Sequence, residues 1–294
     1  MGLFDSAIIK VQDTFSAAPL NRRVAVGDTI YTIPLRGELS KEHLASYEEY
    51  FERMIGFILR RRAGTFADVG VNVGQILLKV KSMDPSRPYI GFEPSLACVA
   101  YVDEVIRINA LSDCTIVPLA LSDRRGTMTF HYSTGADPQA TMIDGFWTAQ
   151  NARKLEKTIF VERGDDVVRS ITADRIAILK VDVEGGELEV LSGFTGILQE
   201  DRPIVLVEVL PYLTNYSGPE TETMAFRERR CRTLMETFAA SGYTPFRILP
   251  GMTIEPVDHF GAERFVAEMT NYIILPDEEV ETFRASLTQA EPVA

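Results

Sequence analysis

A chain of 294 residues can hold one large α/β domain or two small ones, and its 46% hydrophobic and 24% charged residues are ordinary for a globular protein with a substantial core. The formal net charge of −12 makes the average surface repel polyanions, which argues against nucleic acid as a partner. The three cysteines lie far apart, and no apolar run approaches the roughly 20 residues that cross a bilayer, so we expect a soluble protein of the reducing cytoplasm with no membrane span.

Residues 1–62 are predicted to form an N-terminal cap of helical and extended pieces, a helical extension of the domain that follows. An amphipathic stretch covers 3–15, and two short extended pieces at 24–26 and 29–33 are separated by a turn pair. A helix is predicted over 40–62, because apolar side chains recur there at steps of three and four residues and give one buried stripe.

Alternating strands and helices are predicted for one domain from residue 63 to residue 276, followed by a tail at 277–294. Continuous runs rich in Val, Ile and Leu indicate parallel strands buried on both faces, with helices on both sides of the sheet. The fold class is therefore α/β, a Rossmann-like, doubly wound, mostly parallel sheet. The predicted strands are 65–69, 89–92, 115–121, 176–183 and 204–209, and the predicted helices are 75–83, 95–109, 186–198 and 222–240.

Two later runs and one insertion complete the predicted domain. The runs at 244–249 and 271–275 are predicted to add strands in hairpin fashion at an edge of the sheet. The polar segment between 127 and 160 holds the only tryptophan, Trp147. Because long insertions in compact domains are often functional, this segment is predicted to be a lid or a substrate loop.

A glycine-rich turn joins the first predicted strand of the sheet to a helix. Asp68 ends the strand, and Gly70, Asn72 and Gly74 follow it. The glycines permit positive φ and a close approach of backbone to a ligand, which the N–H groups at the helix start would face. A dinucleotide-binding turn has a glycine where Asn72 stands, and the carboxylate of Asp68 suits an ammonium and a sulfonium better than two phosphates. These four residues are therefore predicted to bind S-adenosyl-L-methionine.

The ends of the next two strands are predicted to complete the cofactor site. Glu93 follows the second strand, at a position where a carboxylate accepts both ribose hydroxyl protons. Pro94 ends that strand and suits the first turn of a helix. By order along the chain, the third strand ends beside the adenine, so backbone groups of Ala120 and Leu121 are predicted to contact that ring.

Three charged residues alternate at the end of the fourth predicted strand, where Lys180, Asp182 and Glu184 point to the same side. Charged groups with this spacing on an otherwise apolar strand are costly to bury unless they are paired. This pattern favours an active site over a local ion pair that only fixes the loop. Glu208 ends the fifth strand in a similar way and is a weaker candidate.

In this order the motifs resemble those of the FkbM family of methyltransferases. The matching strings are Asp68-Val69-Gly70-Val71-Asn72-Val73-Gly74, Phe92-Glu93-Pro94, Asn109, Ala120-Leu121-Ser122-Asp123 and Leu179-Lys180-Val181-Asp182-Val183-Glu184-Gly185-Gly186-Glu187. The resemblance covers about residues 64–210. It implies a class I methyltransferase fold and O-methylation of a hydroxyl on a sugar or another small molecule. One stretch departs from the family pattern, since 163–166 reads Arg-Gly-Asp-Asp where the family has a Thr-Leu-Asp-like step.

Methyl transfer to a hydroxyl benefits from a general base, and the predicted catalytic residues are Asp182 or Glu184 as the base, oriented by Lys180. No metal site is predicted, because no histidine or third carboxylate is spaced to complete one around these two carboxylates. The three histidines, His43, His131 and His259, are alternative bases, although an isolated histidine is more typical of an ordinary surface or core position.

Other functions stay open on the sequence alone. They are an NAD-dependent oxidoreductase, a nucleic-acid N-methyltransferase and a non-catalytic cofactor-binding module. The acceptor and the oligomeric state carry no motif. The arginine-rich runs at 60–62 and 227–232 are predicted to be solvated helix faces.

Overall fold

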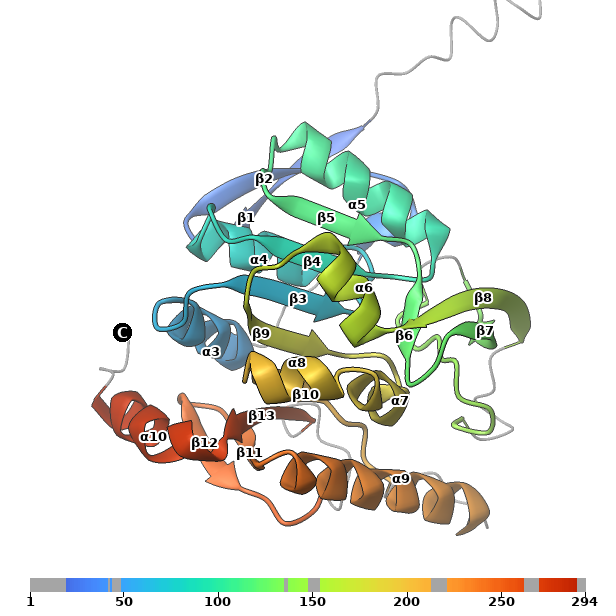
Figure 1. Cartoon of the computed structure of the whole chain (residues 1–294). Coiled ribbons are helices and arrows are strands. Elements are labelled where there is room, and N and C mark those ends of the chain that lie inside the picture. The colour runs from blue at the N-terminus through green and yellow to red at the C-terminus, as the bar shows by residue number, and fades with distance from the viewer. Residues whose placement is uncertain are drawn as a thin grey trace, which may run out of the picture.

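The structure is a computed structural model that describes residues 20–41, 43, 49–134, 137–147, 154–212, 221–261 and 270–289. Its central element is a mostly parallel sheet of eight strands (Figure 1). In spatial order the strands are β12 (Thr253–Pro256), β11 (Tyr243–Leu249), β13 (Asn271–Pro276), β10 (Ile204–Glu208), β9 (Ile176–Val181), β3 (Thr65–Val69), β4 (Tyr89–Phe92) and β5 (Cys114–Val117).

The strand order reverses in the middle of this sheet. The chain goes from β3 outward to β4 and β5, and then returns to β9, which pairs with the other side of β3 and continues to β10. These five strands are parallel, which confirms the predicted doubly wound α/β class. In such sheets the crevice for a ligand lies at the carboxyl ends of the two strands where the order reverses, here β3 and β9.

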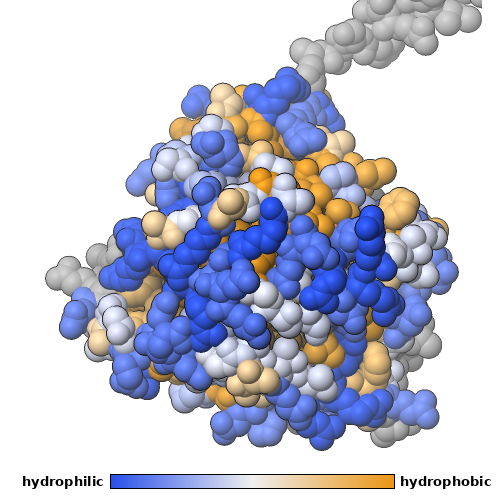
Figure 2. Space-filling view, viewed as in Figure 1, coloured by the Kyte–Doolittle hydropathy of each residue, from blue (hydrophilic) through white to orange (hydrophobic). Residues whose placement is uncertain are grey.

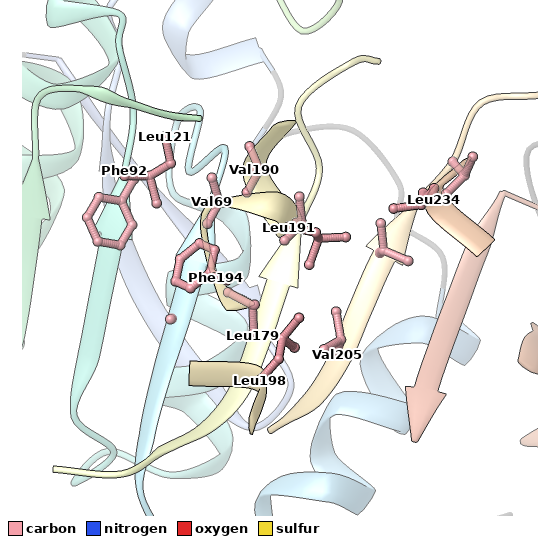
Figure 3. Close-up of a cluster of buried hydrophobic side chains, with 14 of the residues drawn as sticks. Val69, Phe92, Leu121, Leu179, Val190, Leu191, Phe194, Leu198, Val205 and Leu234 are labelled. Atoms are coloured by element: carbon pink, nitrogen blue, oxygen red, sulfur yellow. The ribbon is translucent and has the colours of Figure 1, made fainter. Parts of the chain in front are cut away.

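Helices cover both faces of the sheet because its strands alternate buried side chains between them. One face packs against α6 (Gly164–Ile171), α7 (Glu187–Ser192), α8 (Thr195–Glu200) and α9 (Thr221–Ala240), and the other against α3 (Glu49–Leu59), α4 (Gln75–Met83), α5 (Leu96–Ile108) and α10 (Val280–Gln289). Within β3, Val69 belongs to the first core and Phe66 to the second. Figure 3 shows the first core, where Leu191 and Phe194 lie against the sheet.

The N-terminal part of the described chain is a hairpin followed by helix, and the two strands of the hairpin contain the predicted extended pieces at 24–26 and 29–33. Strands β1 (Asn21–Val26) and β2 (Thr29–Pro34) pair antiparallel, and Ile33 of β2 packs with Tyr101 of α5. Asn109, at the end of α5, fixes the hairpin: its side chain accepts a hydrogen bond from the Thr32 N–H at 2.7 Å and donates one to the Thr32 carbonyl at 2.9 Å. The predicted stretch at 3–15 lies outside the described residues.

The predicted helix over 40–62 is observed as α2 (Glu38–Lys41) and α3, and residues 42 and 44–48 between them are outside the described ranges. The predicted helix over 186–198 was wrong as a single helix, because α7 and α8 are separated at Gly193. A Cβ atom at Gly193 would lie 2.1 Å from the carbonyl oxygen of Ser122, so the backbone turns here against a neighbouring strand.

The predicted strand at 115–121 is also two elements. β5 ends at Val117, and β6 (Ala120–Ser122) belongs to a second sheet, in which it pairs with β8 (Leu155–Arg163), which pairs in turn with β7 (Gly126–Tyr132). Pro118 explains the break, since proline has no N–H to donate to a strand ladder. The predicted loop at 127–160 is therefore largely sheet at its two ends.

Two late strands were predicted at an edge of the central sheet, and their position needs correction. β11 and β13 do pair antiparallel, but β13 lies between β10 and β11, and the unpredicted β12 forms the edge. After β13 comes a short 3-10 helix, η3 (Asp277–Glu279), and then α10, whose Phe283 and Leu287 are buried. The predicted tail thus packs on the core. The domain boundaries at 62 and 276 stay predictions.

The outer surface matches the charged composition. The face in Figure 2 is largely hydrophilic, and Phe160 of β8 is one of the few large apolar side chains that are well exposed, at 76%. Within the described ranges, no helix combines the length and the apolar character that crossing a membrane requires.

Helix α10 should contribute strongly to stability, and a matched pair of substitutions tests this. The ring of Phe283 meets that of Phe57 edge to face, with centroids 5.3 Å apart. We expect Phe283→Ala to lower the free energy of unfolding in urea by about 3–5 kcal/mol, because it removes a buried aromatic side chain. Phe160→Ala, at an exposed position, is the control and should change it by less than about 0.5 kcal/mol. Equal effects of the two substitutions would show that α10 does not belong to the folded core.

Candidate active site

A cavity of about 360 Å³ opens at the carboxyl ends of β3 and β9, where the strand order reverses. Its volume lies in the range of small-molecule sites. Eight of the ten predicted site residues line it: Gly70, Asn72, Glu93, Ala120, Leu121, Lys180, Asp182 and Glu184. Asp68 and Gly74 do not line the cavity.

The turn after β3 needs glycine for a reason of packing. Gly70 has φ +88°, and a Cβ atom there would lie only 1.9 Å from the carbonyl oxygen of Asp182. Asn72 also takes a left-handed conformation, with φ +48°, and Gly74 precedes α4 with φ +88°. The turn therefore brings β3 and the segment after β9 into direct backbone contact at the floor of the cavity.

Glu93, after β4, is held by the backbone around it. Its Oε2 atom accepts the Asn72 N–H at 2.9 Å, and its Oε1 atom accepts the Ser95 N–H at 2.7 Å. Burial raises the pKa of Glu93, and these two N–H groups, with Lys157 and Lys180 farther away, act in the opposite direction. The carboxylate is thus fixed in orientation, and each oxygen keeps a lone pair that can accept a hydrogen bond from a ligand.

Lys180 of β9 joins the two central strands through buried charge. Its Nζ atom lies 3.3 Å from Asp68 Oδ1 and 3.1 Å from Asp182 Oδ2, and it donates to the Gly70 carbonyl at 3.2 Å. Burial acts against the charge of Lys180, but Asp182 and Asp68 outweigh it and raise the pKa of the ammonium above its usual value. The predicted orientation of Asp182 by Lys180 is present in the structure.

The surroundings of Asp68 differ from the cofactor contact that the sequence suggested. Its side chain is fully buried, and its other partner is the Tyr89 hydroxyl, which donates to Oδ2. Burial raises the pKa of Asp68, whereas Lys180 and Tyr89 act to lower it. Since Asp68 does not line the cavity, the predicted direct contact with a cofactor is replaced by a positioning role, in which Asp68 holds Lys180.

A group of carboxylates surrounds the other end of the cavity. Glu184 has φ +53°, and its Oε2 atom is shielded from solvent and has no hydrogen-bond partner among the described residues. Burial, followed by Asp182, Glu208, Glu187 and Asp137, raises the pKa of Glu184 well above its ordinary value. A buried carboxyl group with a raised pKa is a candidate general base.

Segments from outside the five parallel strands also line the cavity. Phe51 of α3 and Asn271 of β13 line it, as do Tyr132, Asp137 and Met142 of the inserted segment. The predicted role of 127–160 in shaping a pocket is supported for its described part. Trp147 does not line the cavity, and its indole N–H donates to the Gln139 carbonyl at 3.0 Å.

Two arginines of α9 bind backbone carbonyls of neighbouring segments. The prediction that the arginine-rich run at 227–232 forms a solvated helix face was wrong for these two. Arg227 is 4% exposed and donates to the Phe146 carbonyl at 2.9 Å. Arg230 donates to the Gly185 carbonyl at 2.7 Å and forms an ion pair with Glu189 of α7. The signal that could have found them is their spacing of three residues, which places both on one face of the helix.

The stretch that departs from the family pattern has a structural role. The carboxylate of Asp165, in the first turn of α6, accepts the N–H groups of Gly196 and Ile197, both at 2.9 Å. Gly164 lies against the ring of Phe194, and a Cβ atom at this position would be 2.4 Å from that ring. These residues therefore fix α6 against α8 and do not line the cavity.

Comparison with known proteins identifies the family. The family model described as the methyltransferase FkbM domain matches residues 68–232, which is more than half of the chain. The chain belongs to the FkbM methyltransferase family. The resemblance seen in the motifs is confirmed, and a methyltransferase replaces the oxidoreductase alternative. Among solved structures, the methyltransferase FkbM of Methylobacillus flagellatus aligns with 72% of this chain and 43% of its own at 13% identity, with a TM-score of 0.43.

Two curated methyltransferases are similar over shorter stretches. Methyltransferase sdnD of Sordaria araneosa is 29% identical over 151 residues, 43% of this chain and 58% of that protein. Hexuronic acid methyltransferase AglP of Haloferax volcanii is 35% identical over 97 residues, 32% of this chain and 37% of that protein. The matched stretches span less than two thirds of either relative.

The FkbM family uses S-adenosylmethionine as its methyl donor, which confirms the predicted cofactor. The residues present fit an adenosyl group. Glu93 offers oriented carboxylate oxygens, and the close turn at Gly70 leaves backbone rather than side chain at the cavity floor. The assignment of individual residues to this cofactor is a proposal and is made below.

Removal of Lys180 should leave a buried charge without its partner. We expect Lys180→Met to lower the free energy of unfolding by about 3–5 kcal/mol near pH 8. The loss should shrink at lower pH, because Asp68, with its ammonium removed, takes up a proton more readily in the folded state. Urea unfolding at pH 5 and pH 8 measures both effects.

Two further variants complete this test. The double variant Asp68→Asn, Lys180→Met should be less destabilised than the single one at pH 8, because the buried carboxylate is gone. Lys41→Met removes a lysine whose side chain is 69% exposed and should cost less than about 1 kcal/mol. A Lys180→Met protein that is as stable as the Lys41→Met control would contradict the structural role of the ion pair.

Proposed function

We propose that this FkbM methyltransferase transfers the methyl group of S-adenosylmethionine to a hydroxyl of a small, polyhydroxylated acceptor such as a sugar. The observation that carries the proposal is one continuous cavity with an oriented carboxylate, Glu93, at one end and a shielded carboxyl without a hydrogen-bond partner, Glu184, at the other. The first suits the ribose of the cofactor, and the second suits a hydroxyl that must lose its proton.

The cofactor end would be formed by the turn after β3 and by the ends of β4 and β6. Glu93 would accept the ribose hydroxyls, and backbone at Gly70 and Asn72 would lie along the methionine part. The backbone and apolar side chains of Ala120 and Leu121 would form the wall for the adenine. When bound, S-adenosylmethionine supplies an electrophilic methyl group, so the chain has to position the acceptor, exclude water and remove a proton.

Glu184 is a better base than Asp182, although the sequence left both open. Asp182 is already paired with Lys180 at 3.1 Å, so its carboxylate is engaged by a neighbouring side chain. Glu184 has a raised pKa, and its Oε2 atom has no partner among the described residues. We therefore assign proton removal to Glu184 and the placement of the loop to Lys180 and Asp182.

Other features support the same proposal. The histidines at 43, 131 and 259 are all described, and none lines the cavity, so none competes with Glu184 as the base. The relative AglP is named for a hexuronic acid, which is a sugar acid. The cysteines at 98, 114 and 231 are free thiols, in keeping with the proposed reducing cytoplasm.

Loss of charge at Glu93 should weaken cofactor binding. We expect Glu93→Gln to reduce the affinity for S-adenosylhomocysteine by roughly 10- to 100-fold, the cost of losing charge-assisted hydrogen bonds. Isothermal titration calorimetry measures the dissociation constant. Asp103→Asn, at an exposed position of α5, is the control and should bind normally. Unchanged affinity in Glu93→Gln would show that Glu93 does not belong to the cofactor site. Failure of the unaltered protein to bind S-adenosylhomocysteine would overturn the proposed function.

Replacement of Glu184 should strongly reduce turnover and remove the acid limb from the pH dependence of kcat/KM. In the unaltered enzyme kcat/KM should rise with pH through the raised pKa of Glu184, because only the ionised form accepts a proton. The decline on acidification should therefore begin well above the ordinary value of about 4.3. We expect Glu184→Gln to lower kcat by roughly 10²- to 10⁴-fold and to lack this limb.

The control for Glu184 is a binding measurement on the same variant. Glu184→Gln should keep its affinity for S-adenosylhomocysteine within about threefold, since Glu184 lies at the acceptor end. A variant that turns over normally, or that retains the acid limb, would show that another group is the base.

A further inference from the structure

The turn after β9 is held by two charged side chains to which the proposed mechanism gives no role. Glu187, at the start of α7, accepts the Gly185 N–H at 2.9 Å, and Arg230 of α9 donates to the Gly185 carbonyl at 2.7 Å. The Glu187 side chain is buried, so its hydrogen bond is shielded from solvent. The Gly185 N–H belongs to the planar peptide group that joins Glu184 to Gly185. Glu187 therefore holds the peptide group that directly follows the assigned base.

The backbone of this turn takes conformations that need support from its surroundings. Glu184 has φ +53° and Gly185 has φ +100°, so both residues lie in the left-handed region. A residue other than glycine is sparsely populated there and keeps such a conformation only where neighbouring contacts hold it. The contacts from Glu187 and Arg230 to Gly185 are of this kind, because they bind the N–H and the carbonyl of the same residue.

Packing does not fill all of the space around the turn. A second cavity, of about 20 Å³, is lined by Gly185, Glu187 and Arg230, together with Cys231 and Leu234 of α9 and others. A space of this size holds about one water molecule and leaves the turn room to move. The hydrogen bonds from the two charged side chains therefore have to restrict the turn where packing does not.

We propose that Glu187 is a positioning residue, which sets the direction in which Glu184 enters the cavity by holding the peptide group between Glu184 and Gly185. This inference rests on the proposed function, in which Glu184 receives the hydroxyl proton. Arg230 supports the turn from the carbonyl side and is itself held by its ion pair with Glu189 of α7. The motif Glu-Gly-Gly-Glu at 184–187 thus has a role for each member, since its two glycines let the second carboxylate bind the peptide group of the first.

The charge of Glu187 provides a signature of this contact. Burial raises the pKa of Glu187 to about 7, and Asp182 acts in the same direction, whereas the N–H groups of Gly185 and of Glu187 itself and the charge of Arg230 oppose the rise. The other charged or titratable groups around Glu187 are Glu184 before the turn and Arg227 and Cys231 of α9. Above about pH 7 the ionised carboxylate makes the stronger hydrogen bond, and below it the neutral carboxyl group makes a weaker one.

The test follows this one peptide group by NMR in the full chain. Gly185 is the only glycine in the sequence that follows a glutamate. Labelling of glutamate with ¹³C at the backbone carbonyl and of glycine with ¹⁵N therefore gives a single cross-peak, from the peptide group between Glu184 and Gly185. Its carbonyl shift reports the backbone conformation at Glu184, and its amide proton shift reports the hydrogen bond to Glu187. We expect the amide proton to move upfield as the pH falls through about 7.

Two substitutions of Glu187 separate its charge from its hydrogen bond. Glu187→Gln keeps an oxygen acceptor, so it should retain the carbonyl shift of the unaltered protein and lose the pH-dependent step near 7. Glu187→Leu removes the acceptor, so it should change the carbonyl shift and speed exchange of the Gly185 amide with solvent by at least about tenfold. Asp165→Asn is the matched control and should leave the cross-peak unchanged, because Asp165 also accepts backbone N–H groups, at 2.9 Å, but does not line the cavity.

The possible results separate this inference from the proposed function. A pH-dependent step that persists in Glu187→Gln would overturn the positioning role, because it would then belong to another group such as Glu184. A carbonyl shift that changes as much in Asp165→Asn as in Glu187→Leu would also overturn it, and Glu187→Gln decides alone if Glu187→Leu does not fold. Failure of the unaltered protein to bind S-adenosylhomocysteine in calorimetry would overturn the proposed function, whereas the cross-peak, which needs no ligand, decides the role of Glu187 independently.

Discussion

The buried ammonium of Lys180 is the interaction on which the site depends. It lies between Asp68 and Asp182 and joins the ends of two parallel strands at the point where the strand order reverses. Charges are buried in a core only when they are paired, so this arrangement fixes the register of β3 against β9. The same register brings Gly70 under the carbonyl of Asp182, where only glycine fits. The position of the cavity floor therefore depends on the ion pairs of Lys180 with Asp68 and Asp182.

The glycine pair after Glu184 links this carboxyl group to the inserted segment. A Cβ atom at Gly185 would lie 2.4 Å from the ring of Phe146, and one at Gly186 would lie 2.9 Å from the end of Met142. Arg227 then stacks on Phe146 at 4.2 Å, and Arg230 binds the Gly185 carbonyl. These glycines therefore permit a turn and also leave room for the insertion to pack. Movement of the insertion would consequently change the position of Glu184.

Much of the fold could be predicted because its strands are short, apolar and bounded by turn residues, as 65–69 and 89–92 show. The break inside 115–121 could have been read from Pro118, but the pairing of β6 with β8 depends on contacts across forty residues that no local pattern reveals. In the site, the alternation at Lys180 and Asp182 predicted that both charged groups lie on one side of the strand, and the structure shows them as an ion pair, which was the alternative to the favoured active site. The direction of the Asp68 side chain could not be predicted, because a strand-end carboxylate can face a ligand or a neighbouring lysine. In the structure the Tyr89 hydroxyl donates to this carboxylate and holds it away from the cavity.

The cavity draws on residues inside the stretch that the family model matches and on residues outside it. The cofactor end is made from strand ends and the turns that follow them, and all of them lie within the matched stretch at 68–232. The acceptor end also draws on Phe51 and Asn271, outside that stretch, and on an insertion between strands of a second sheet. The family match therefore covers the strand ends at β3, β4 and β9, while segments distant in sequence complete the cavity around them.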